Sequence, residues 1–245
     1  MNLEEFCPRL HALKREEKDL SRFIPEGRVL LGELLKDSTW FRVDLERLIL
    51  DPEFLNRQEP SIYPNEVTLY RSPDRTFSIQ AYFWEPRTTS AVHDHGSWGI
   101  VGAMIYPVRE RKYRRLDDGR GEGRAELEET SRSWIKPGET TFVLPLDEGI
   151  HLMEAPEEHG SVSLSVYGRS IRYGYIQFFD LNRKTVRRVY PPRLLKKVLA
   201  VRTLGYLAEP WGEEILKASA AGPRPEYLEK EIGQALARIR AKESL

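Results

Sequence analysis

Apolar and polar residues alternate in short runs through the middle of the chain, between residue 61 and about residue 180. The run from Phe77 to Trp84 is one example, and this alternation is typical of a β-strand because successive side chains point to opposite faces. Turn signals such as Ser72-Pro73-Asp74 and Lys136-Pro137-Gly138 separate the runs. Short strands at this spacing predict an all-β sandwich or barrel, which we place at residues 61–182.

Both ends of the chain have a helical pattern instead. Residues 1–60 carry apolar residues at helical spacing, with Ser38 as a candidate cap and with breaks expected at Pro25-Glu26-Gly27 and Asp51-Pro52. Residues 183–245 contain two amphipathic stretches with apolar residues at intervals of three and four. We therefore expect helical extensions at both ends, which either pack on the barrel or form the interface of a homo-oligomer.

Composition places the chain among globular proteins, with 245 residues of which 40% are hydrophobic and 31% are charged. The 38 basic and 38 acidic residues cancel, so no net charge attracts nucleic acid or an anionic membrane surface. Basic residues between positions 109 and 133 alternate with acidic ones, which favours an exposed hairpin over a nucleic-acid patch. No apolar run approaches the roughly 20 residues that span a bilayer. We expect neither nucleic acid nor a membrane as a partner.

The cysteine content and the first residues of the chain indicate the cellular compartment. Cys7 is the only cysteine, which excludes an intramolecular disulfide and fits a reducing environment. The first residues are acidic and form no apolar segment of the kind found in signal peptides. Both observations favour a cytoplasmic location.

Three of the five histidines form a candidate metal site. His93 and His95 are one residue apart on an expected strand, so their imidazoles share a face and Asp94 points the opposite way. His151 follows a turn and begins another apolar run, and an antiparallel barrel can bring it opposite the first two. The remaining histidines, His11 and His159, lie in a charged helical run and in a turn, where a surface position is expected.

Three blocks of sequence in this order resemble the cysteine dioxygenase-type branch of the cupin superfamily, the thiol dioxygenases. The similarity covers about residues 66 to 170. General cupins place a glutamate ligand a few residues after the paired histidines, whereas residues 98 to 101 here are Trp, Gly, Ile and Val, which cannot ligate a metal. The three blocks are His93-Asp94-His95 with Trp98-Gly99, Pro137-Gly138-Glu139 leading to Gly149-Ile150-His151, and Ser163-Leu164-Ser165-Val166-Tyr167-Gly168.

The resemblance implies a mainly β fold, a cupin double-stranded β-helix (jelly-roll barrel), with iron(II) held by His93, His95 and His151. It further implies that a small carboxylated thiol, such as cysteine or 3-mercaptopropionate, reacts with dioxygen to give a sulfinic acid. Because the ligands would be three neutral imidazoles, up to three coordination positions would stay open.

The same resemblance assigns roles to further residues. Tyr167 would donate a hydrogen bond at the metal, and Ser163 would share its face of the strand. Ser165 stands where the family commonly has histidine. Arg71 resembles the arginine that grips the substrate carboxylate, a task that suits the guanidinium fork. The cysteine that some relatives cross-link to the active-site tyrosine has no counterpart here.

Two other functions remain open at this stage. Imidazole binds iron, zinc, copper and nickel, so the ligands alone do not choose the metal. With zinc, the same barrel would suit a hydrolase or isomerase, because zinc lowers the pKa of a bound water. Alternatively, the protein is a cupin sensor or binding module that holds a metal or a small acid without turnover.

Overall fold

Eleven strands form two antiparallel sheets in the computed structural model, which describes residues 1–119, 121, 123–219 and 225–243. The first sheet has the order β1-β2-β9-β4-β7 and the second β11-β10-β3-β8-β5-β6. The sheets make a double-stranded β-helix, so the predicted fold class, mainly β with helical extensions, is confirmed. The strands are β1 (Glu66–Arg71), β2 (Phe77–Trp84), β3 (Val92–His95), β4 (Gly99–Ile105), β5 (Val108–Arg115), β6 (Leu127–Ile135), β7 (Thr140–Val143), β8 (Leu146–Glu154), β9 (Ser161–Gly168), β10 (Ile176–Asp180) and β11 (Thr185–Val189).

The chain divides into two compact units. One contains the barrel and consists of residues 1–59, 63–171 and 177–187, so the N-terminal helices belong to it. The other consists of residues 60–62, 172–176 and 188–245. Strand β11 thus lies beyond the boundary that the sequence placed at residue 182.

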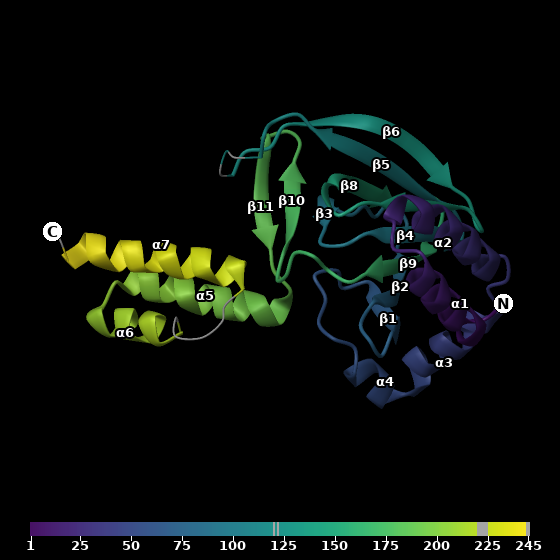
Figure 1. The fold of residues 1–245 in the computed structure, drawn as a ribbon, viewed down its shortest axis with the longest axis horizontal. Coiled ribbons are helices and arrows are strands. Elements are labelled where there is room, and N and C mark those ends of the chain that lie inside the picture. Colours follow the sequence, from purple (N-terminus) through teal and green to yellow (C-terminus); the bar gives the residue numbers. More distant parts are fainter. Residues whose placement is uncertain (120, 122, 220–224, 244–245) are drawn as a thin grey trace. The chain divides into compact units, whose positions relative to one another are not determined.

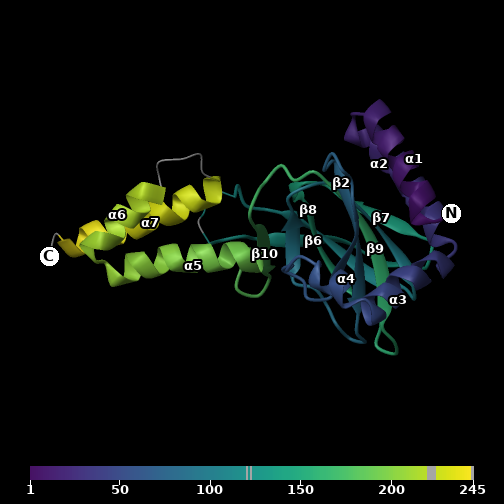
Figure 2. The ribbon, with the colours of Figure 1, turned by 90° about the horizontal axis from the view of Figure 1, so that it is seen from below.

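Helices from the first 59 residues cover the outer face of the first sheet. Helix α2 contacts β4 and β7, and α1 packs on α2, so both lie beside this sheet (Figures 1 and 2). The largest hydrophobic core fills the space between these helices and the strands. The helices are α1 (Leu3–Glu16), α2 (Leu20–Leu35), the 3-10 helix η1 (Thr39–Phe41), α3 (Arg42–Leu50) and α4 (Pro52–Asn56).

Two local predictions for this segment were wrong. Helix α2 continues through Pro25-Glu26-Gly27, because Pro25 lies on the exposed side, where water can satisfy the carbonyl that loses its amide donor. Gly27 is needed for packing, since a Cβ there would lie 2.6 Å from Cδ1 of Ile100. Ser38 precedes η1 without a side-chain cap, and Asp37 Oδ1 accepts the hydrogen bond from the Thr39 amide instead. The expected break at Asp51-Pro52 is confirmed, with Asp51 as the N-cap of α4.

One face of β2 and β9 packs against the N-terminal helices outside the barrel, while Tyr82 and Trp84 of β2 face the interior. In β9, Leu164 and Val166 pack in the helix-covered core, while Ser163, Ser165 and Tyr167 face the interior. Successive side chains of a strand point to opposite faces of the sheet. Because the helices cover the outer apolar face, the inner face can carry polar side chains. The interior is thereby available for chemistry.

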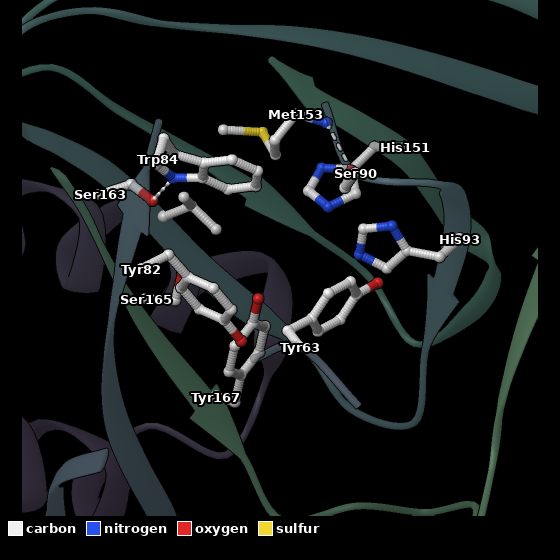
Figure 3. A pocket seen from close by; sticks show the side chains of 11 residues that line it. Tyr63, Tyr82, Trp84, Ser90, His93, His151, Met153, Ser163, Ser165 and Tyr167 are labelled. Carbon is white, nitrogen blue, oxygen red and sulfur yellow. Dashed lines mark hydrogen bonds between the residues drawn. The ribbon is translucent and has the colours of Figure 1, made fainter. Parts of the chain in front are cut away.

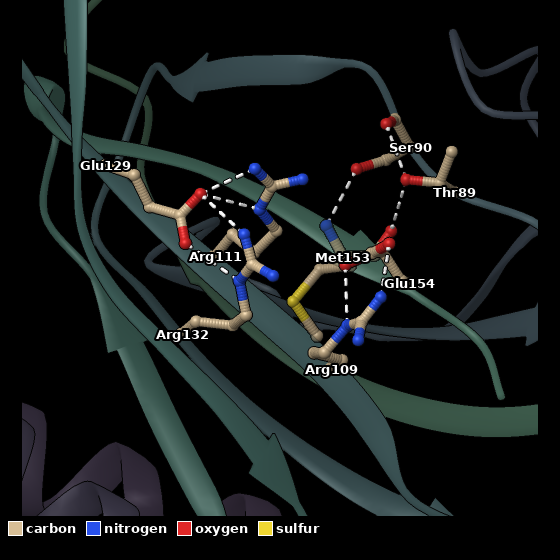
Figure 4. Close-up of polar contacts among 8 residues, drawn as sticks. All are labelled: Thr89, Ser90, Arg109, Arg111, Glu129, Arg132, Met153 and Glu154. Carbon is tan, nitrogen blue, oxygen red and sulfur yellow. Dashed lines mark hydrogen bonds and ion pairs between the residues drawn. The ribbon is translucent and has the colours of Figure 1, made fainter.

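The charged segment forms the expected hairpin, made of β5 and β6. Arg114 and Arg111 of β5 pair across the hairpin with Glu128 and Glu129 of β6. Arg132 contacts Glu129 within β6, so Glu129 lies between Arg111 and Arg132 (Figure 4). Residues 120 and 122 of this segment lie outside the described residues. The arginines named here are therefore paired with acidic neighbours.

The second unit has its own helices and core. The sequence predicted two helices and missed α6, a short segment whose Trp211 and Ile215 are half exposed. Glu231 of α7 receives hydrogen bonds from Arg202 and Tyr190 within this unit. A homo-oligomer through the terminal helices stays a prediction. The helices are α5 (Pro192–Leu207), α6 (Pro210–Ser219) and α7 (Glu226–Glu243).

Within the described part of the chain, no helix combines the length and the apolar character needed to cross a membrane.

Truncating the core under the helices should destabilise the barrel. Leu164 is fully buried, so Leu164→Ala should lower the free energy of unfolding by about 2–5 kcal/mol through lost burial and a cavity. Leu50 is 70% exposed, and Leu50→Ala should change it by less than about 0.5 kcal/mol. Equilibrium urea unfolding measures both, and equal effects of the two substitutions would contradict this packing.

Candidate metal centre and cavity

Three buried histidines converge inside the barrel. His93 and His95 lie on β3, and His151 lies on the neighbouring strand β8 directly opposite His93. The centroids of the three rings are 4.7–4.8 Å apart in every pair. The structure therefore brings together the three predicted metal-ligand candidates.

Each ring is held at its Nδ1 atom. His93 Nδ1 lies 2.8 Å from the Ala91 carbonyl oxygen, and His95 Nδ1 lies 3.1 Å from that of Gly149. Carbonyl oxygens only accept hydrogen bonds, so both Nδ1 atoms carry the proton and both Nε2 atoms present a lone pair. His151 Nδ1 lies 2.8 Å from a carboxylate oxygen of Glu110, which fixes the same tautomer.

This donor set fits one metal ion. The candidate ligand atoms of the three histidines lie within 4.8 Å of one another. Imidazole–metal bonds are about 2.0–2.1 Å, so nitrogens on a shared ion are roughly 3–3.5 Å apart, and the rings would move closer together on binding it. Burial lowers the pKa of His93 and holds that of His151 well below its usual value, so both rings are neutral near pH 7, as metal ligands must be.

The backbone around the histidines requires a glycine at position 149. A Cβ at this position would lie 1.8 Å from the Leu144 carbonyl oxygen, so only glycine fits here. The same residue supplies the carbonyl that holds His95. The Gly149-Ile150-His151 block therefore positions two of the three imidazoles.

Asp94 hydrogen-bonds to a neighbouring strand and is not one of the candidate metal ligands. Its Oδ1 accepts a hydrogen bond of 2.7 Å from the backbone amide of Gln177 on β10, the strand on the other side of β3 from β8. Asp94 is fully buried. This contact helps to hold β3, and hence both of its histidines, in the sheet.

A small cavity opens beside the histidines (Figure 3). Sheet residues from both sides and Tyr63, from the segment before β1, form its wall. The described lining residues are Tyr63, Tyr82, Trp84, Ser90, His93, Val101, His151, Met153, Ser163, Ser165 and Tyr167.

Tyr167 and Ser163 both lie where the shared-face argument predicted. The Tyr167 ring stacks on His95 with centroids 5.6 Å apart, and Gly99 leaves room for it, since a Cβ there would lie 2.7 Å from the ring. Burial raises the pKa of Tyr167 to about 12 against the hydrogen bonds of Ser165 and Tyr82, which lower it. The phenol is therefore protonated at neutral pH and can donate.

Sequence reasoning missed the role of two aromatic residues. Trp84, at the end of β2, lines the cavity and donates its indole N–H to the Ser163 hydroxyl at 2.9 Å. Tyr63 lies 5.4 Å from His93 between ring centroids and turns its hydroxyl towards that ring (Figure 3). Tyr63 belongs to an irregular segment, so no periodic signal marked it.

Arg71 lies apart from the other predicted site residues. Its side chain is 53% exposed and its Nη2 atom pairs with Glu59 at 2.8 Å. It is not among the described residues that line the cavity. Its role as a carboxylate anchor stays a prediction.

The two histidines expected at the surface are outside the site. His11 Nε2 pairs with Asp74 at 2.8 Å, and exposed His159 stacks on Tyr106. His159 therefore serves as a control for the buried histidines.

Strand β8 is fixed on both sides of the cavity wall. The Met153 amide donates to the Ser90 hydroxyl at 3.0 Å, while Glu154 on the outer face forms two hydrogen bonds with Arg109 (Figure 4). These contacts hold the strand that carries His151.

Comparison with known proteins bears on the fold. No family model matches the chain. A cupin 2 conserved barrel domain protein from Rhodopseudomonas palustris is 13% identical, with a TM-score of 0.36 over 48% of this chain and 67% of that one. A cupin 2 barrel protein from Salinispora arenicola is 17% identical, with a TM-score of 0.32 over 44% and 80%.

A structure of DMSP lyases is also similar, at 14% identity and a TM-score of 0.30 over 42% of this chain and 46% of that one. At these identities and scores, the similarities carry no argument about activity or substrate.

A side chain at position 149 should loosen the metal centre. Gly149→Ala forces the Leu144 carbonyl away and displaces the carbonyl that holds His95, so affinity for zinc should fall at least about tenfold. Gly233 has nothing within 4 Å of a built Cβ, so Gly233→Ala is the matched control. Competition with a chromogenic chelator measures both, and wild-type affinity in Gly149→Ala would contradict the positioning.

Proposed function

We propose that this protein is an iron(II)-dependent dioxygenase that oxidises a small thiol to its sulfinic acid with dioxygen. The observation that supports it is a set of three buried imidazoles, each held at Nδ1, beside a cavity lined by Tyr167, Trp84 and Met153. Resemblance in the three sequence blocks contributes the choice of thiol and dioxygen.

The histidines would hold the metal, and the remaining positions would face the cavity. His93, His95 and His151 would bind through Nε2, and no carboxylate among the described residues completes the set. When bound, iron(II) would supply open coordination positions and redox chemistry for joining a thiolate sulfur to dioxygen.

Chain residues supply the surroundings of the reacting groups. Tyr167 keeps its phenolic proton at neutral pH and offers a hydrogen bond from the wall next to His95. Trp84 fixes the Ser163 hydroxyl by donating to it, and Met153 and Val101 give an apolar surface for a thiol sulfur. Burial of this wall limits the access of water.

The zinc alternative has the same ligand set in its favour. Three histidines with an open position also hold catalytic zinc, which would give a hydrolase or isomerase. Elemental analysis of protein purified without added metal distinguishes the two, since iron is expected here and zinc would favour the alternative. Metal without any thiol-dependent oxygen uptake would favour a binding module.

Removing one imidazole should abolish iron binding. His93→Ala, His95→Ala and His151→Ala should each lose iron and thiol-dependent oxygen uptake, because two nitrogens cannot hold the ion against water. His159→Ala should keep both. Iron per chain is measured after anaerobic loading and desalting, and full iron content in all three variants would refute the ligand assignment.

Removing the Tyr167 hydroxyl should impair turnover more than binding. Tyr167→Phe keeps the ring that stacks on His95 and loses the donor, so kcat should fall about 10- to 100-fold with little change in iron content. Tyr106→Phe is the control, because Tyr106 is half exposed and lies outside the cavity lining. Steady-state oxygen uptake over a panel of thiols gives kcat and KM, and an unchanged kcat would remove this role.

A further inference from the structure

Glu110 is a buried carboxylate in a strand whose sequence looks like surface. It lies on β5 within a run of arginines and lysines, for which the sequence predicts an exposed hairpin. Its side chain is nevertheless only 2% exposed, because β5 alternates and Val108 and Glu110 face inward while Arg109 and Arg111 face outward. A carboxylate is rarely buried without a hydrogen-bonding or charged partner, because the partner compensates for the hydration energy lost on burial.

Three groups surround this carboxylate. Oε1 accepts the hydrogen bond from His151 Nδ1 at 2.8 Å, and Oε2 accepts one from the Thr141 hydroxyl at 2.6 Å. The Lys112 ammonium lies 3.7 Å from Oε2 and donates to the Phe142 carbonyl. One oxygen therefore faces the metal ligand, while Thr141 and Lys112 anchor the other.

The three imidazoles are thus not equivalent. His93 and His95 are held by neutral backbone carbonyls, whereas His151 is held by a charged group. The first two show that a neutral oxygen is enough to fix an imidazole, so orientation alone does not require a carboxylate at position 110. What the carboxylate adds is negative charge.

We propose that Glu110 is a positioning residue that makes His151 the strongest donor of the three and so sets the affinity and the reduction potential of the bound metal. This proposal rests on the proposed metal centre. A divalent ion held by three neutral imidazoles keeps its full charge in a buried site, and a carboxylate behind one ligand offsets part of it. The negative charge of the Glu110 carboxylate stabilises a trivalent ion more than a divalent ion.

The isosteric variant Glu110→Gln separates charge from geometry. Its amide oxygen can still accept from His151 Nδ1, and its amide nitrogen can donate to the Thr141 hydroxyl, so the hydrogen bonds remain and the charge is lost. Glu128→Gln is the matched control, because Glu128 is on the neighbouring strand β6 and pairs with Arg114 at an exposed position. Apo-protein unfolding midpoints show whether each variant folds.

Cobalt(II) is the probe for affinity and ligand field. Wild-type protein and Glu128→Gln should bind one cobalt per chain with equal affinity and the same visible spectrum. Glu110→Gln should bind cobalt(II) about 10- to 100-fold more weakly and shift its visible absorption band. These effects are expected when a metal-binding histidine loses the charged partner of its other ring nitrogen. In the iron-loaded proteins, each tenfold loss of iron(III) affinity relative to iron(II) should raise the midpoint potential by about 59 mV.

The outcomes separate this inference from the proposed function. Wild-type protein that binds no cobalt, zinc or iron would overturn the metal centre and this inference with it. Wild-type binding together with an unchanged affinity, spectrum and potential in Glu110→Gln would overturn the role of Glu110 alone.

If Glu110→Gln does not fold, Thr141→Val tests the same point, because it keeps the charge and removes the anchor of Oε2. It should shift the cobalt band and weaken binding less than about tenfold. Wild-type values in Thr141→Val would then count against the proposal.

Discussion

The candidate site depends on hydrogen bonds at the far side of three imidazoles. Each Nδ1 atom faces an oxygen atom of the protein, so each ring is held with its Nε2 atom available to a metal ion. The acceptors belong to the strands themselves: two are backbone carbonyls, and the third is an inward-facing side chain of β5. The convergence of the three imidazoles is therefore a consequence of sheet register.

The position of the main hydrophobic core makes this polar interior possible. Barrel strands usually bury apolar residues inside, but one apolar face of β2 and β9 packs against α1 and α2 on the outside. Serine, tyrosine and histidine can then occupy the inner face without loss of the core. The N-terminal helices thus support the chemistry of a cavity that they do not line.

Much of this could be predicted from particular residues. The alternation around His93 and His95 correctly placed both rings on one face, and antiparallel pairing brought His151 opposite them. Ser163, Ser165 and Tyr167 share the inner face because the same two-residue period applies. Arg71 lies at the end of a strand, where sequence gives no information on the direction of a long side chain, and it pairs with Glu59.

Other features depend on contacts that the sequence does not display. Glu110 stands among charges, and only the paired strands show that its position faces inward. Tyr63 reaches the cavity from an irregular segment without periodicity. Pro25 and Gly27 have the composition of a turn, yet Gly27 is required by the close approach of Ile100 and the helix continues through both.

X-ray absorption on the iron(II)-loaded protein tests the central claim most directly. With one iron per chain, the spectrum should contain the multiple scattering of three imidazole rings with iron–nitrogen distances of about 2.1 Å. A spectrum with only water or carboxylate oxygen around the iron would contradict the account.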